Sequence, residues 1–109
     1  MNAVLIVVDM LNDFFTRSPA LGMQRSRLVA GTNLLVRAFR SKGLPVLWVR
    51  QEFAPDLHDA FLEMRANEVS VTIAGTLGCE LLPELEHLPD SDCSFVESRC
   101  NIVEDTVRA

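Results

Sequence analysis

The sequence predicts an α/β fold in which helices flank a parallel sheet of about three main strands. Residues 3–8 form an apolar run rich in β-branched side chains, which is typical of a strand buried on both faces of a parallel sheet. A helical pattern over residues 24–42 separates this run from a second apolar run at residues 45–50. Because the joins are short, the three segments form a βαβ unit with parallel strands and a right-handed crossover.

The helix over residues 24–42 is expected to follow a loop at residues 16–22, where turn formers cluster around Ser18 and Pro19. Lys42 and Gly43 provide the stop signal, with a cation in the last turn. The stripe expected to face the sheet consists of Leu28, Thr32, Leu35, Val36 and Phe39.

The middle of the chain is less regular. A short helical stretch is expected over residues 56–65, opened by Pro55, and a brief edge segment over residues 69–73. A single helical turn is expected over residues 80–85, and a third strand over residues 93–97. The glycines at 75 and 78 match no phosphate-loop pattern.

Length and charge limit the class of protein. A chain of 109 residues with 49% hydrophobic residues is expected to form one domain, residues 1–109, with a well-filled core. Its net charge is −5 and its ten Lys and Arg residues are scattered, so nucleic acid is an unsuitable partner. No stretch is long enough to span a bilayer and no basic leader opens the chain, so we expect a cytoplasmic protein without a membrane partner.

Asp9 is the first candidate site residue, because it ends the first apolar run. In open α/β sheets, ligands and catalytic groups gather at the carboxyl ends of the strands. The alternative is that Asp9 is an N-cap or turn residue that only closes the strand.

The cysteines and histidines give no metal-ligand spacing, and neither a metal nor a cofactor is expected. Cys79, Cys93 and Cys100 are an odd set without a CxxC pair, so we expect free thiols packed as small apolar groups. His58 and His87 belong to no metal motif.

Three stretches resemble the isochorismatase-like cysteine hydrolases, the superfamily that also holds nicotinamidases and ureidoacrylate-type amidohydrolases. Residues 7–14, VVDMLNDF, are similar to the VVDMQNDF opening of the family. Residues 48–61 resemble the second-strand block of one branch, and residues 75–85 resemble the glycine turn and short helix before the third strand. The resemblance implies a Rossmann-like sheet, here incomplete.

The resemblance also implies a triad of Asp, Lys and Cys that hydrolyses a C–N amide or related bond in a small metabolite. Asp9 matches the family aspartate, which acts as a base, and Phe15 is a candidate wall for a small-molecule ligand. At the family lysine position stands Glu97 instead, and a carboxylate beside Asp9 raises the pKa of one acid and disfavours a neighbouring thiolate.

The family nucleophile follows a fourth strand, and the chain is expected to be truncated before it. Cys100, just past Glu97, is an alternative nucleophile that lacks a cationic partner. We therefore expect an inactive hydrolase homologue; a further alternative is that Asp9 and Glu97 bind a divalent metal.

The alternative function belongs to another class of protein. By resemblance, the first strand lies centrally in the family sheet, so its outer edge would be left exposed here. An exposed apolar edge is a template for strand pairing. The chain would then be a non-catalytic module that forms a homo-oligomer, or pairs with a homologue, through the first-strand edge.

Overall fold

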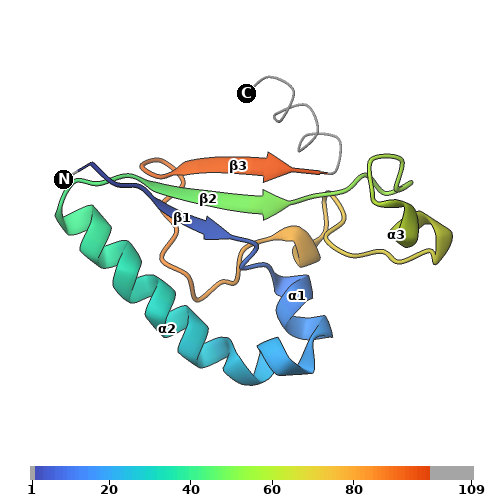
Figure 1. Ribbon diagram of the computed structural model, residues 1–109, viewed down its shortest axis with the longest axis horizontal. Coiled ribbons are helices and arrows are strands. Elements are labelled where there is room, and N and C mark those ends of the chain that lie inside the picture. The colour runs from blue at the N-terminus through green and yellow to red at the C-terminus, as the bar shows by residue number, and fades with distance from the viewer. Residues whose placement is uncertain (1, 99–109) are drawn as a thin grey trace.

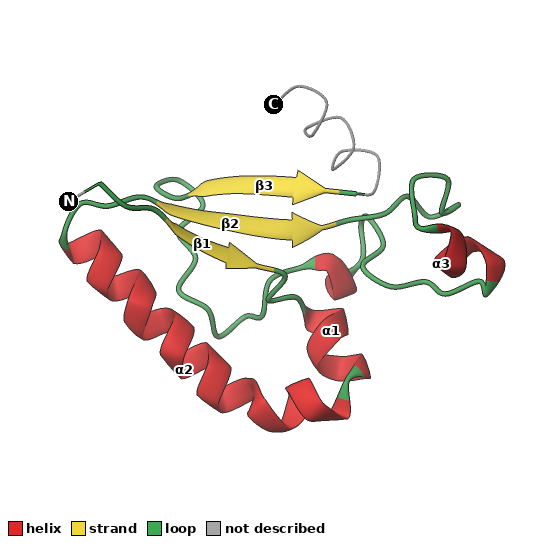
Figure 2. Ribbon diagram, viewed as in Figure 1, coloured by secondary structure: helices red, strands yellow, loops and turns green. Residues whose placement is uncertain are grey.

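The computed structural model describes residues 2–98, which form a three-stranded sheet with helices packed mainly against one face (Figure 1; Figure 2). The elements in chain order are β1 (Leu5–Val8), α1 (Asn12–Arg17), α2 (Pro19–Ser41), β2 (Val46–Gln51), α3 (Leu62–Ala66), the 3-10 turn η1 (Leu77–Cys79) and β3 (Cys93–Glu97).

The sheet has the order β1-β2-β3, and both pairings are parallel. The register aligns Val8 with Val49, and Val49 in turn with Phe95. The α/β class and the parallel first unit predicted from the sequence are therefore confirmed. Among residues 2–98, β1 is an edge strand, because its only strand partner is β2.

The main core lies between the sheet and α2, with the segment before β3 closing it from the side. Trp48 on β2 and Val36 on α2 are fully buried, and Leu82 packs into the same cluster. A second, smaller cluster lies beyond the carboxyl end of β2 and is built on Phe53 and Leu57. The core thus holds α2 along one face of the sheet and leaves the strand ends open to the loops.

The expectation that the first strand is buried on both faces is wrong for the described residues. Val7 faces α2 and is buried, whereas Ile6 is 51% exposed and Val8 is 53% exposed. The reason is that helices cover only the face of β1 that carries Val7, so alternate side chains point to an open face.

The long helix begins earlier than predicted. Ser18 and Pro19 initiate α2 instead of breaking the chain: Pro19 occupies the first turn, and the Leu21 N–H donates to Ser18 Oγ at 3.2 Å. The stripe of α2 that meets the sheet is centred on Val29 and Val36, so Leu28 and Leu35, expected in the core, are exposed. The preceding helix α1 was not predicted at all.

The middle of the chain contains less regular structure than expected. The predicted helix over residues 56–65 is reduced to α3, because residues 54–60 form turns in which Asp59 Oδ1 accepts the Ala54 N–H at 2.8 Å. The predicted edge segment contributes one bridge, between Ile73 and Phe53. The helical turn lies at η1, three residues before its predicted start, whereas β3 has the predicted bounds.

Within residues 2–98 we find no helix with the length and apolar character needed to cross a bilayer.

Candidate active site

Asp9 and Glu97 lie at the same end of the sheet, where the carboxyl ends of the three parallel strands meet. The Asp9 N–H donates to Val49 O at 2.9 Å, which fixes Asp9 beside the end of β2. On the other side, Glu97 aligns with Gln51, and the Glu52 N–H donates to Glu97 O at 2.9 Å. The two acids predicted from the sequence therefore flank the end of β2.

Asp9 has an unusual backbone and an unpartnered oxygen. Its φ of 58° lies in the left-handed region, which non-glycine residues adopt rarely and often at functional sites. Its Oδ1 atom is buried and has no hydrogen-bond partner. A buried polar atom without a protein partner costs stability unless another group binds it, so Asp9 Oδ1 is a candidate acceptor for a ligand.

The local electrostatics favour the protonated form of Asp9. Partial burial raises the pKa of Asp9 above its ordinary value of 3.8, and the negative charge of Glu97 raises the pKa further. A lysine at position 97 would act in the opposite direction. Asp9 therefore has a second acid, Glu97, as its neighbour instead of a cation.

The turn alternative for Asp9 agrees with its backbone, because a left-handed residue turns the chain at the end of β1. The N-cap alternative is wrong. Leu11 occupies the cap position of α1, and no side chain caps that helix.

Phe15 belongs to the main core, where it is almost completely buried. It packs in the cluster between the sheet and α2. Its role as a wall for a ligand stays a prediction.

The two described cysteines occupy different environments. Cys79 is 1% exposed; its Sγ donates to Thr76 O at 3.2 Å and lies 4.0 Å from Glu52 Oε2. It packs as a small buried thiol, as expected. Cys93 is exposed at the start of β3, so the expectation of a packed thiol is wrong there. Cys100 lies outside the described residues.

A contact missed by sequence reasoning joins α1 to the loops that contain Thr72 and Gly78. Asp13 Oδ2 accepts the Thr72 N–H at 2.7 Å, and a Cβ added to Gly78 would lie only 2.2 Å from that oxygen. Asp13 and Gly78 also line a cavity of about 380 Å³. The only available signal was the acid two residues after Leu11, in the motif that contains Asp9.

A second missed residue, Asp92, connects three elements at the amino end of β3. Its carboxylate accepts the indole N–H of Trp48 at 2.7 Å and the Leu88 N–H at 3.0 Å, and it pairs with Arg40. Burial raises the pKa of Asp92, but the hydrogen bonds from Arg40, Leu88 and Trp48 outweigh burial, so the pKa lies below its ordinary value.

Among residues 2–98, no three His, Cys, Asp or Glu side chains gather closely enough to hold an ion. Asp9 and Glu97 alone offer fewer oxygens than a hard cation requires.

The fold and the site together define a class of protein. It is an α/β protein with a parallel sheet, and its candidate site lies at the carboxyl ends of the strands, where β1 ends in a strained aspartate. Within that class, the chain belongs to the isochorismatase family, because the isochorismatase domain model matches residues 3–107.

Solved structures share the fold of the chain. The chain is similar to a pyrazinamidase of Pyrococcus horikoshii in complex with zinc, at 26% identity and a TM-score of 0.63, covering 86% of this chain and 50% of that one. It also matches an N-carbamoylsarcosine amidase from Thermoplasma acidophilum at 22% identity and a TM-score of 0.70, covering 99% of this chain and 63% of that one. An isochorismatase family protein from Desulfovibrio vulgaris matches at 23% identity and a TM-score of 0.65, covering 94% and 60%.

The chain therefore spans between half and two thirds of the length of these three structures. No curated protein shows significant similarity to it.

Proposed function

We propose that this chain is a homologue of the cysteine hydrolases that cleave a C–N amide or related bond in a small metabolite, and that the 109-residue chain does not itself catalyse this hydrolysis. The observation that carries the proposal is the pairing of Asp9 with Glu97 at the strand ends. A cytoplasmic location and a single domain over residues 1–109 belong to the same proposal.

The expected lack of catalysis has an electrostatic cause. A cysteine nucleophile attacks as the thiolate, which a neighbouring base or cation must favour. Here a second carboxylate stands where the resemblance expects an ammonium group, and burial together with the negative charge of Glu97 raises the pKa of Asp9. Such a site opposes formation of a thiolate next to it.

The two described cysteines do not supply a nucleophile for this site. Cys79 is buried, which keeps a substrate away from its sulfur, and an acid lies close to it. Cys93 is exposed but lies at the opposite end of β3 from Glu97. Neither thiol combines access with a place beside Asp9.

An ammonia-release assay on the purified chain tests the proposal. Pyrazinamide and N-carbamoylsarcosine are suitable probes, because the names of two neighbouring structures refer to their cleavage. We expect no release above the blank for the chain or for Asp9→Asn. Turnover by the chain that Asp9→Asn abolishes would overturn the proposal.

A second candidate function is that of a pairing module, and the free edge of β1 favours it. Among residues 2–98, the outer side of β1 has no strand partner, although the strand consists of apolar residues. Edges of this kind pair with other strands. Light scattering tests this candidate, because Ile6→Lys should lower the mass of any assembly held by this edge.

A further inference from the structure

A cavity of about 340 Å³ lies over β2 and β3, on the face of the sheet that carries Trp48. Arg50 lies two residues after Trp48 on β2, and Ser94 is the register partner of Trp48 on β3, so both belong to this face. The other lining residues come from the segment 80–87, and neither Asp9 nor Glu97 is among them. The cavity is therefore separate from the candidate active site and has the volume of a small-molecule site.

Arg50 and Glu80 bring opposite charges to this cavity without sharing a hydrogen bond. Arg50 Nη1 donates to Cys79 O at 3.1 Å but lies 3.9 Å from Glu80 Oε1, and Arg50 Nη2 lies 3.9 Å from Glu52 Oε2. Hydrogen bonds between N–H and O are shorter, at most about 3.2 Å. Within residues 2–98, the guanidinium and the Glu80 carboxylate thus retain donors and acceptors that a ligand can use.

The backbone around Glu80 is held in place by hydrogen bonds. The Glu80 N–H donates to Leu77 O at 3.1 Å, and the Asn12 N–H donates to Glu80 O at 3.0 Å. Two residues later, the Leu82 N–H donates to Met10 O at 2.9 Å. Arg50 projects from a central strand. Both charged groups are therefore carried by fixed backbone, as a binding site requires.

The rest of the lining is mainly apolar and consists of Leu81, Leu82, Pro83 and Leu85 with His87 and Ser94. The two polar members contact each other, since Ser94 Oγ lies 3.4 Å from His87 Nε2. The His87 ring also packs edge-on against Trp48, with ring centroids 5.2 Å apart. An apolar wall thus stands beside the pair of opposite charges.

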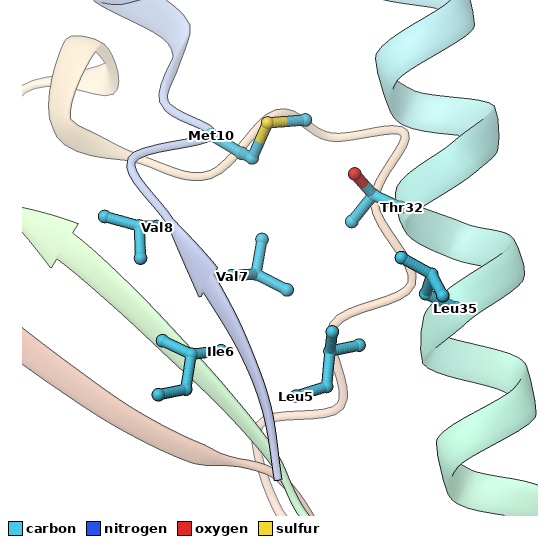
Figure 3. A pocket seen from close by; sticks show the side chains of 7 residues that line it. All are labelled: Leu5, Ile6, Val7, Val8, Met10, Thr32 and Leu35. Carbon is cyan, nitrogen blue, oxygen red and sulfur yellow. The ribbon is translucent and has the colours of Figure 1, made fainter.

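The groove between β1 and α2 has a different lining. Figure 3 shows its seven side chains, of which Thr32 is the only polar one and none is charged. Its volume, about 220 Å³, is also smaller. A ligand that carries charges is therefore suited to the cavity over β2 and β3 and not to this groove.

We propose that the cavity over β2 and β3 binds a zwitterionic α-amino acid with an apolar side chain. The ligand carboxylate bonds to Arg50, the ammonium group bonds to Glu80, and the side chain packs on the apolar wall. The charges of Arg50 and Glu80 cancel, as do those of the ligand, whereas a monoanion would meet Glu80 and a monocation would meet Arg50. This inference goes beyond the proposed function and does not depend on it.

NMR titration of the ¹⁵N-labelled chain with L-leucine tests the inference. Two analogues of leucine each lack one charged group: 4-methylpentanoate has no ammonium group, and 3-methylbutylamine has no carboxylate. We expect leucine to shift the amide signals of Arg50, Glu80 and Ser94, and each analogue to bind at least about tenfold more weakly, because each leaves one charged group of the cavity without a partner.

Two glutamates on the same segment supply matched variants. Glu80 and Glu84 are both exposed and both pair with an arginine, but only Glu80 lines the cavity. Glu80→Gln should weaken leucine binding at least about tenfold, whereas Glu84→Gln should leave it unchanged. Arg50→Gln should abolish binding, with circular dichroism to check its fold. Because Glu80 is 57% exposed, its variant remains folded and informative if Arg50→Gln does not fold.

The remaining outcomes overturn the inference. They are no signal shifts with leucine at 10 mM, shifts confined to residues outside the cavity, equal binding of leucine and either analogue, and equal binding by the native chain and Glu80→Gln. The hydrolysis assay is unaffected by each of these results, so the two proposals fail independently.

Discussion

Two aspartates at opposite ends of the sheet have contrasting environments. Asp92, at the amino end of β3, accepts hydrogen bonds from Trp48, Leu88 and Arg40. Asp9, at the carboxyl end of β1, keeps a buried oxygen without a partner and faces a second acid. The first arrangement holds the fold together, whereas the second retains a destabilising charge where the fold places ligand sites. Stability and the candidate site are therefore built at opposite ends of the strands.

The largest expected effect comes from removing the satisfied carboxylate. Asp92→Ala leaves the guanidinium of Arg40 and the indole N–H of Trp48 without their acceptor, and we expect a loss of about 3 kcal/mol in the free energy of unfolding. Urea denaturation measures it. The exposed neighbour Asp90 provides the control, because Asp90→Ala should change stability by less than about 0.5 kcal/mol. Equal losses of unfolding free energy in the two variants would show that Asp92 does not hold these elements together.

At the other end of the sheet, removing a carboxylate is expected to raise the free energy of unfolding instead of lowering it. Because the pKa of Asp9 is raised in the folded state, its contribution to stability is greatest below pH 3.8 and is lost as the pH rises through the folded-state pKa. Asp9→Asn should therefore stabilise the chain at pH 7, by less than about 1 kcal/mol since the carboxyl is only half-buried. Thermal melts from pH 3 to pH 7 check this. A variant less stable than the native chain at pH 7 would contradict it.

Exchanging the charge at position 97 tests the electrostatic cause of the raised pKa of Asp9. Replacing the acid at position 97 by a cation should lower the pKa of Asp9, since an ammonium favours the neighbouring carboxylate. Carbon-detected NMR titration of the Asp9 carboxyl should give the order native, Glu97→Gln, Glu97→Lys from the highest pKa to the lowest. Because burial is the larger cause, Glu97→Gln should leave the pKa above 3.8. A return to 3.8 in that variant would make Glu97 the main cause instead.

The smallest effect is expected at a third, exposed aspartate. Asp56 Oδ1 lies 2.6 Å from His58 Nδ1, and this hydrogen bond raises the pKa of His58 above 6.5. Asp56→Asn should lower the pKa of His58, as followed by NMR of the ring protons, with little change in melting temperature because both groups are exposed. A large change in melting temperature would show that this pair belongs to the structural network.

The periodic elements of the fold could be predicted, whereas its contacts could not. The apolar runs gave β2 to within one residue at each end, and β3 has the predicted bounds. The start of α2 was missed because Ser18 and Pro19 are found both in turns and at helix starts, and only packing decides between them. The open face of β1 was missed because an apolar run does not reveal which layers cover it.

The candidate site was predictable in part for a related reason. Asp9 and Glu97 each end a strand, and parallel strands bring their carboxyl ends to one edge, so topology alone joins these two residues. Asp13 accepts the Thr72 N–H from 59 residues away and Asp92 accepts the Trp48 indole N–H from 44 residues away, and no local pattern encodes these two partners.

The fit between Gly78 and Asp13 makes substitutions at these two positions interdependent. A side chain at position 78 would collide with the Asp13 carboxylate, so variation at 78 requires either a smaller residue at position 13 or a movement of that carboxylate away from the Thr72 N–H. A library that varies one position at a time would bear the cost of this collision at Gly78, whereas a paired library that also shortens residue 13 would avoid it. The order of mutational steps along this part of the chain is thus constrained by geometry.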